Sequence, residues 1–422
     1  MRPPEQIGDR VATPLGTPVL PAGRPGLPSA LYIHIPFCAA RCHYCDFVTY
    51  TTLGASIEPY IDALTAEISG MGGPITVGPA LRTLYLGGGT PSLLSPQQLA
   101  RILAALRRVY GLDPGLELTL EANPGDVSIE LLTGYRRCGV NRLSLGMQSA
   151  GGGELRLLGR RHTHEETRLA VHQARLAGLQ NVSLDLIYGL PGQTLGDWTG
   201  NVDAALALEP DHLSAYCLTI EAGTRLGAWV RRGQIEPGSD DLAAEMVEWL
   251  GDRLSRAGFT QYEIANWAAG PAAADGFPAF ACRHNLTYWM NQPYLGVGAG
   301  AHGYWAGVRY ANVTRVADYI RRVRGQRERP PNALYLPAAT WRAEVGEQEA
   351  SRDTLLLGLR LTAGVSVEDY LRRHGSAAWE RERTSLDRLH GDGLIEWTQG
   401  GRRVRLTPRG RMLGNRVFAE FA

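Results

Sequence analysis

Cys38-Ala39-Ala40-Arg41-Cys42-His43-Tyr44-Cys45 follows closely on the apolar run Leu31–Ile35. A short apolar run predicts a buried β-strand, so the three cysteines fall in the loop that leaves the end of that strand. Three thiolates this close together can converge on one metal centre, and soft thiolates favour an iron–sulfur cluster or zinc. A structural zinc site would need a fourth ligand at short spacing, and His43 is poorly placed inside the array. A [4Fe–4S] cube held by three cysteines would instead leave one iron open for a non-protein ligand.

The composition is that of an ordinary globular protein. The chain has 422 residues, of which 44% are hydrophobic and 20% charged, and its formal net charge is +1. This length suggests about two or three domains. The near-zero net charge excludes a globally basic nucleic-acid-binding protein. Six cysteines are too few to stabilise a chain this long through disulfides. The clustering of Cys38, Cys42 and Cys45 therefore favours metal binding.

The N-terminal segment carries no recognisable targeting signal. Residues 1–30 contain seven prolines and four glycines, and no basic stretch is followed by an apolar one. They predict a flexible or extended arm. No run of about 18 apolar residues is present, which excludes an ordinary transmembrane helix. We therefore expect a cytoplasmic protein.

Residues 31–220 alternate short apolar strands with amphipathic helices. Ser95 followed by Pro96 predicts the start of one helix, and another is expected over His164–Leu176. The six expected strands are Leu31–Ile35, Leu81–Leu86, Glu117–Glu121, Arg142–Leu145, Val182–Ile187 and Leu213–Ile220. Strands separated by helices form parallel sheets. Because polar and glycine-rich residues repeatedly follow the strand ends, the pattern favours an α/β fold with a partial (β/α)6 barrel.

Two further regions follow the predicted barrel. Residues 221–335 are less regular and rich in aromatic side chains, and we expect them to extend the barrel, with a linker near Pro330-Pro331-Asn332. Residues 336–422 predict helices followed by a hairpin around Gly400-Gly401, which is the winged-helix pattern. Their arginines and acids nearly balance, so this domain is not expected to bind DNA.

Five motifs occur in the order of one known family. They are Tyr32-Ile33-His34-Ile35-Pro36-Phe37-Cys38, Gly87-Gly88-Gly89-Thr90-Pro91, Glu121-Ala122-Asn123-Pro124, Arg142-Leu143-Ser144-Leu145-Gly146-Met147-Gln148 and Asp185-Leu186-Ile187-Tyr188-Gly189-Leu190-Pro191-Gly192. Together with the cysteine array they resemble the radical S-adenosylmethionine (SAM) family of oxygen-independent coproporphyrinogen III oxidase-like proteins, which includes a heme-chaperone branch. The resemblance runs from about Leu31 to the C-terminus.

The resemblance implies a cofactor site. Cys38, Cys42 and Cys45 would hold a [4Fe–4S] cluster whose open iron chelates the amino and carboxylate groups of SAM. The implied chemistry is reductive cleavage of SAM to methionine and a 5′-deoxyadenosyl radical. The implied SAM contacts are Tyr32, Tyr44, Gly88, Gly89, Thr90, Glu121, Gln148, Arg160, Asp185 and Cys217. Taken singly, each of these polar residues could equally be a satisfied group at a strand end, and the glycines a plain turn.

Three features separate the two branches of this family. The oxidase pattern carries another cysteine two residues after the third, where this chain has Phe47. The oxidase also has a longer N-terminal extension than the thirty residues before Leu31. His284-Asn285-Leu286-Thr287-Tyr288-Trp289 matches the HNxxYW motif of the chaperone branch, and His284 could supply an imidazole to heme iron. The alternative is a histidine bonded in the core, with Tyr288 and Trp289 packing around it.

The sequence therefore predicts a heme chaperone whose ligands are heme, SAM and a [4Fe–4S] cluster. Its partners would be heme-accepting proteins such as respiratory enzymes, with no nucleic acid. The alternative function is oxidative decarboxylation of coproporphyrinogen III to protoporphyrinogen IX. A radical SAM enzyme that modifies RNA or protein is a third class, which the balanced charge argues against. Oligomeric state and peripheral membrane contact through partners stay open.

Overall fold

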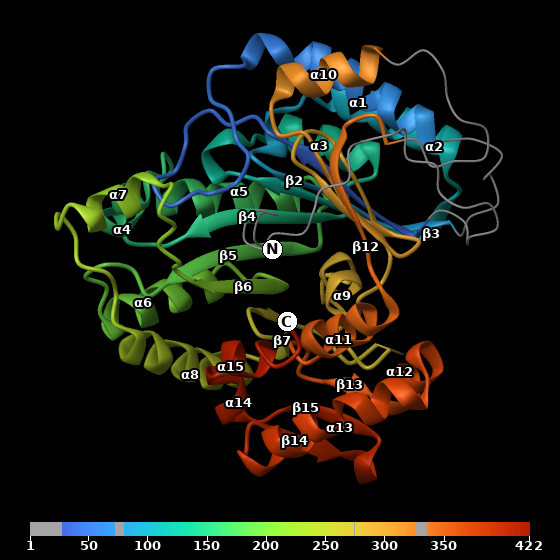
Figure 1. Cartoon of the computed structure of the whole chain (residues 1–422). Helices are drawn as coiled ribbons and strands as arrows, with labels where there is room; N and C mark the ends of the chain where they lie inside the picture. Colours follow the sequence, from blue (N-terminus) through green and yellow to red (C-terminus); the bar gives the residue numbers. More distant parts are fainter. Residues whose placement is uncertain (1–27, 72–79, 274, 326–335) are drawn as a thin grey trace.

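Six parallel strands run through the centre of the fold (Figure 1). The structure is a computed structural model, and it describes residues 28–71, 80–273, 275–325 and 336–422. The strands are β1 (Ala30–Ile35), β2 (Leu81–Gly88), β3 (Leu112–Ala122), β4 (Arg142–Gln148), β5 (Val182–Tyr188) and β6 (His212–Cys217). They lie side by side in sequence order, and each neighbouring pair is parallel.

Helices connect consecutive strands, as parallel pairing requires. They are α1 (Ile57–Met71), α2 (Pro96–Val109), α3 (Ile129–Cys138), α4 (Gly152–Leu158), α5 (His164–Leu176) and α6 (Leu195–Leu206). The helix starting at Pro96 begins as the sequence predicts. Ser95 accepts a hydrogen bond from the Gln98 N–H, and the Gln98 side chain accepts one from the Ser95 N–H. The predicted partial (β/α)6 barrel is confirmed.

The strands place apolar side chains on one face and polar ones on the other. In β1, Leu31 and Ile33 are fully buried in the main core, whereas Tyr32 between them is half-buried and lies near the rings of Tyr85 and His284. Side chains alternate across a strand, so residues 32, 85, 121 and 185 can share the inner face of the barrel. The ends of the strands thus bring polar groups from distant parts of the sequence to one place.

The region after β6 contributes strands to both edges of the sheet. It contains α7 (Arg225–Arg231), α8 (Asp240–Arg256), β7 (Thr260–Glu263), β8 (Asn266–Ala268), α9 (Arg283–Trp289), β9 (Leu295–Val297), β10 (His302–Trp305), β11 (Val308–Asn312) and α10 (Val316–Gly325). β9 pairs parallel with β1, and β8 pairs antiparallel with β6. α10 packs on α1 above the sheet (Figure 1). The aromatic-rich region is therefore more regular than its sequence suggests.

The C-terminal part has its own apolar core. β12 (Ala339–Glu344) still pairs with β11, so we propose that the boundary lies near residue 345 and not near 336. Beyond it lie α11 (Glu347–Gly358), β13 (Val365–Ser366), α12 (Val367–His374), α13 (Ser376–Gly391), β14 (Ile395–Thr398), β15 (Arg403–Leu406), α14 (Pro408–Met412) and α15 (Gly414–Phe418). β14 and β15 form the expected hairpin, which packs with α13 around Leu386, Leu394 and Val404.

Two predictions fall largely outside the described residues, namely the arm over 1–30 and the linker at Pro330-Pro331-Asn332. Within the described ranges, no helix is both long enough and apolar enough to span a bilayer.

Candidate functional site

The cysteine loop starts at the carboxyl end of β1 and is closed by backbone hydrogen bonds. The Cys38 N–H donates to the Tyr50 carbonyl at 3.0 Å, and the Tyr50 N–H donates to the Pro36 carbonyl at 2.7 Å. His43 ties the loop to α4, because its Nδ1 lies 2.9 Å from the Leu157 carbonyl oxygen. The His43 ring also packs edge-on against Trp229. His43 is thus held apart from the thiols, as its position inside the array predicts.

The glycine turn after β2 packs directly against the start of this loop. The Gly89 N–H donates to the Ile35 carbonyl at 2.9 Å, and the Thr90 N–H donates to the Phe37 carbonyl at 2.8 Å. The Thr90 hydroxyl donates to Cys38 Sγ at 3.5 Å. A Cβ at Gly89 would lie 2.6 Å from the Phe37 oxygen and 3.0 Å from Cys38 Sγ. The contact requires glycine, so this turn is more than a plain reversal of the chain.

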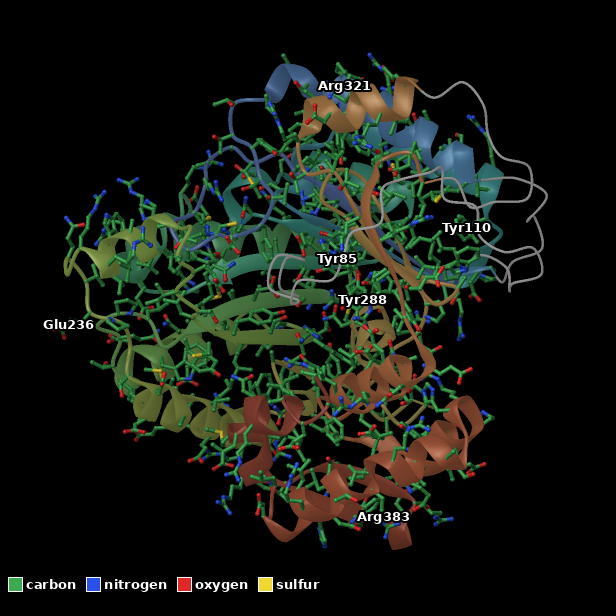
Figure 2. All side chains as sticks on the ribbon, in the orientation of Figure 1. Tyr85, Tyr110, Glu236, Tyr288, Arg321 and Arg383 are labelled. Atoms are coloured by element: carbon green, nitrogen blue, oxygen red, sulfur yellow. The ribbon has the colours of Figure 1, made fainter. Side chains whose placement is uncertain are left out.

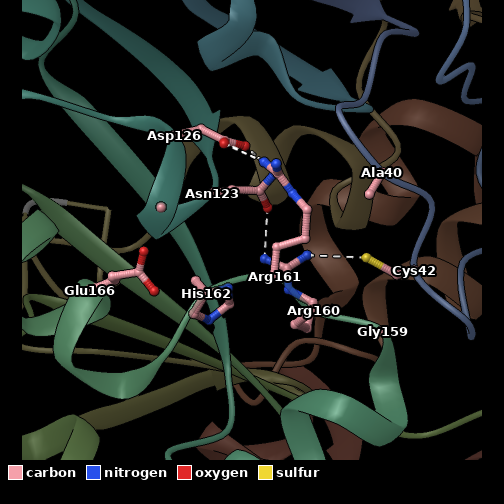
Figure 3. A pocket seen from close by; sticks show the side chains of 10 residues that line it. Ala40, Cys42, Asn123, Asp126, Gly159, Arg160, Arg161, His162 and Glu166 are labelled. Atoms are coloured by element: carbon pink, nitrogen blue, oxygen red, sulfur yellow. Dashed lines mark hydrogen bonds and ion pairs between the residues drawn. The ribbon is translucent and has the colours of Figure 1, made fainter.

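Arg160 connects the cysteine loop with the ends of β3 and β4. Its Nη1 donates to Cys42 Sγ at 3.4 Å, and its Nη2 donates to Asn123 Oδ1 and to the Gly146 carbonyl, both at 2.7 Å. Asn123 in turn donates to the Thr90 hydroxyl at 3.0 Å. Figure 3 shows Arg160 with its partners Asn123 and Cys42. These three residues and Ala40, among others, line a cavity of about 120 Å³.

Glu121, at the end of β3, is held on both oxygens. The Tyr85 hydroxyl donates to its Oε1 at 2.8 Å, and the Gly88 N–H donates to its Oε2 at 3.0 Å. Burial, with a smaller contribution from nearby Asp185, raises the pKa of the Glu121 carboxyl to about 7, although the hydrogen bond from Tyr85 lowers it. A carboxylate fixed at a strand end can accept bonds from a cationic amino group, which would restore its ordinary ionised state.

The remaining expected contacts lie in the middle of β5, at the ends of β4 and β6, and in the cysteine loop. Ser144 donates to both carboxylate oxygens of Asp185, at 3.2 and 3.1 Å, and burial raises the pKa of Asp185. Gln148 ends β4 with a φ of 63°, an uncommon conformation for a residue other than glycine. Tyr44 packs with Leu158 and Ile187, and Cys217 is exposed at the end of β6.

Three thiols on one loop are a donor set that suits an iron–sulfur cluster. Cys38, Cys42 and Cys45 are all half-buried on one short loop. In the described part of the chain, no three His, Cys, Asp or Glu side chains are grouped as they would be around one metal ion. Burial, with a smaller contribution from the neighbouring Cys42 and Cys38, raises the pKa of Cys45 to about 11, so iron binding must displace protons here.

His284 lies at the opposite end of the barrel from the cysteine loop and is 1% exposed. Its Nδ1 lies 2.9 Å from Thr83 Oγ1, and its Nε2 lies 2.8 Å from the Tyr288 hydroxyl. Its ring stacks on Tyr85 with centroids 5.2 Å apart. Its ring also lies edge-on to Tyr288, and both tyrosines are labelled near the centre of Figure 2. Both ring nitrogens are occupied, so in this conformation His284 is the bonded core histidine and not a free ligand.

Three functional candidates escaped the sequence reasoning. Asn123 accepts a hydrogen bond from Arg160, and Tyr85 donates one to Glu121, so both residues hold implied SAM contacts in place. Asn123 lies within the Glu121–Pro124 motif, and Tyr85 lies two residues before the Gly87–Pro91 motif. Arg142, the first residue of β4, is 2% exposed, and its Nε has no hydrogen-bond partner among the described residues. The alternation of β2 could have revealed Tyr85, because residues 85 and 87 share a face.

Comparison with known proteins places this site in a family. Residues 32–204 match the radical SAM superfamily, and residues 346–413 match the HemN C-terminal domain. The chain is 36% identical over 405 residues to heme chaperone HemW of Lactococcus lactis, covering 93% of this chain and 97% of the relative. The chain belongs to the HemW family. The HemW protein of Mycobacterium tuberculosis is 39% identical over 399 residues, covering 94% of this chain and 95% of the relative.

A solved structure agrees with the HemW assignment at the level of the fold. The coproporphyrinogen III oxidase HemN from Escherichia coli superposes with a TM-score of 0.78, covering 95% of this chain and 91% of that one. At 24% identity this likeness shows the fold alone. The radical SAM match implies a [4Fe–4S] cluster and SAM, which the thiol loop and the polar strand ends suit.

Proposed function

We propose that this chain is a heme chaperone, which binds heme and delivers it to heme-accepting proteins such as respiratory enzymes. The observation that carries the proposal is the match over 97% of a relative named heme chaperone HemW. Similarity of this extent includes the C-terminal domain and the HNxxYW helix as well as the barrel. It therefore concerns the whole molecule, beyond the radical SAM core that many activities share.

The position after the cysteine array supports delivery over oxidase chemistry. Phe47 stands two residues after Cys45, where the oxidase pattern has a further cysteine, and its side chain is 66% exposed. A thiol is absent from that position, and a large exposed apolar side chain replaces it. An exposed phenylalanine beside a cofactor loop suits contact with a partner or a ligand.

We assign the cluster and SAM contacts from the family resemblance and from the hydrogen bonds described above. Cys38, Cys42 and Cys45 would hold the [4Fe–4S] cluster. SAM would lie against Tyr32, Tyr44, Gly88, Gly89, Thr90, Glu121, Gln148, Arg160, Asp185 and Cys217. When bound, the cluster supplies an electron, while Arg160 keeps a positive charge beside Cys42 and Glu121 offers an acceptor at the end of β3.

The function is tested by offering two ligands to one preparation. Anaerobically reconstituted protein receives heme, and separately receives coproporphyrinogen III with SAM and a reductant. We expect a heme Soret band that saturates at a fixed stoichiometry and no protoporphyrinogen IX. Formation of protoporphyrinogen IX, or the absence of saturable heme binding, would overturn the proposal.

A further inference from the structure

One side of α9, the helix that carries the HNxxYW motif, borders a cavity. Thr83 in β2 bonds to His284 in α9, and both side chains point into the barrel. The residue before each, Arg82 and Arg283, is exposed. Neighbouring side chains on a strand point to opposite faces, so Arg82 points away from the barrel interior that Thr83 faces. Arg283 is the first residue of α9, and both arginines line the same cavity.

These arginines line a cavity of about 600 Å³. Its lining includes Leu286 and Thr287 from α9, Met290 directly after that helix, and Tyr304, Trp305 and Gly307 from the β10–β11 hairpin. In Figure 1, α9 lies between the strands of the barrel and α11. Sites for small molecules and cofactors in proteins usually enclose about 300–1,000 Å³ and combine apolar walls with a few polar groups. This cavity has that size and that character.

The charges at the cavity suit a ligand with two carboxylates. Arg283 is 50% exposed; its Nη2 donates to the Gly115 carbonyl at 2.9 Å, while its Nε lies 3.8 Å from Glu117. Glu117 is nearly buried, and both of its oxygens accept backbone N–H groups at the start of α9. Asp275 also lines the cavity, and its carboxylate accepts the Phe277 N–H at 3.1 Å. Arg82 and Arg283 therefore bring two guanidinium groups to this cavity, although Glu117 and Asp275 stand beside them and already accept backbone N–H groups.

We propose that heme binds in this cavity, outside the barrel, with Arg82 and Arg283 pairing with its two propionates. The porphyrin face packs on Leu286, Met290 and Tyr304, which offer apolar and aromatic surface. This inference rests on the proposed heme-chaperone function and locates its ligand. It gives the HNxxYW helix a role that does not need His284 as an iron ligand. His284 anchors the helix inside the barrel, and the opposite face of the helix contacts heme.

The experiment compares heme with its dimethyl ester, which has the same ring and iron but no free carboxylate. Dissociation constants are measured by Soret titration for wild type, Arg82→Ala, Arg283→Ala and the control Arg108→Ala, an exposed arginine on α2. We expect each cavity variant to bind heme about tenfold more weakly, as loss of a charge-assisted hydrogen bond predicts. The same variants should bind the dimethyl ester as wild type does, and Arg108→Ala should change neither affinity.

A second pair of variants tests the cavity without touching its charge. The Thr287 hydroxyl donates to the Arg283 carbonyl in its own helix, and the Thr199 hydroxyl donates to the Gly196 carbonyl in α6, so the two threonines are a matched pair. Thr287→Trp should fill the cavity and weaken binding of heme and of its ester alike, whereas Thr199→Trp on α6 should not. Wild-type heme affinity in Arg82→Ala, Arg283→Ala and Thr287→Trp would overturn the location and leave the chaperone function standing. Failure of wild-type protein to bind heme would instead overturn the function itself.

Discussion

Replacing Gly89 by alanine should disturb the cysteine loop. The added Cβ would lie 2.6 Å from the Phe37 carbonyl oxygen, 2.9 Å from the Ile35 oxygen and 3.0 Å from Cys38 Sγ. Two of these three atoms belong to the backbone and cannot rotate away. Overpacking of this kind costs about 1–3 kcal/mol, and relief requires the strand end and Cys38 to move apart.

The assay has two readouts and a matched control. The free energy of unfolding in urea is measured on cluster-free protein, and iron and sulfide are measured after anaerobic reconstitution. Gly251 lies inside α8 with no atom within 4 Å of an added Cβ, so Gly251→Ala should stabilise by about 0.5–1 kcal/mol and leave the cluster intact. Gly89→Ala should lose about 1–3 kcal/mol and much of its iron. Wild-type stability together with wild-type iron content in Gly89→Ala would refute the packing argument.

Three further predictions concern the cluster, the SAM site and the core. Alanine at Cys38, Cys42 or Cys45 should abolish a competent cluster, and undiminished iron and sulfide would contradict this. Because burial raises the pKa of Glu121 to about 7, SAM should bind more tightly at about pH 8 than at about pH 6. Calorimetry on Glu121→Gln should show this pH dependence largely gone. If the pH dependence persists in that variant, another group causes it. Burial also raises the pKa of Glu67 to about 7, despite bonds from Tyr319, Gly298 and Asn312. Between about pH 5 and 7 the folded state therefore keeps a proton on Glu67, whereas the unfolded chain has lost it. The free energy of unfolding should fall as the pH rises through this range, by at most about 1.4 kcal/mol per pH unit for this group. Urea titrations of Glu67→Gln should show a shallower slope, and an unchanged slope would count against the assignment.

Much of the barrel could be predicted because its signals are local. Ser95 and Pro96 set the start of α2, and the apolar period over His164–Leu176 matches α5 residue for residue. The glycine turn and the cysteine array lie at strand ends, where parallel strands meet at one edge. The strands β7, β8 and β9 escaped prediction because runs of three or four residues carry no measurable period.

The contacts that support the site depend on tertiary structure. Thr83 and His284 are 201 residues apart, so no sequence window reveals that their side chains bond. The same holds for Arg160, which lies 118 residues from Cys42. His284 illustrates the difference clearly. As part of HNxxYW it could be read as an iron ligand, but the fold gives both of its nitrogens partners within the protein.

Delivery of heme is the central claim, and a competition measurement tests it most directly. Heme-loaded protein is mixed with a heme-free respiratory acceptor in the presence of an excess of a heme scavenger that traps any free heme. Direct handover predicts that the acceptor gains heme at a rate that does not depend on the scavenger concentration. Loss of all transferred heme to the scavenger, with the acceptor left empty, would contradict the account.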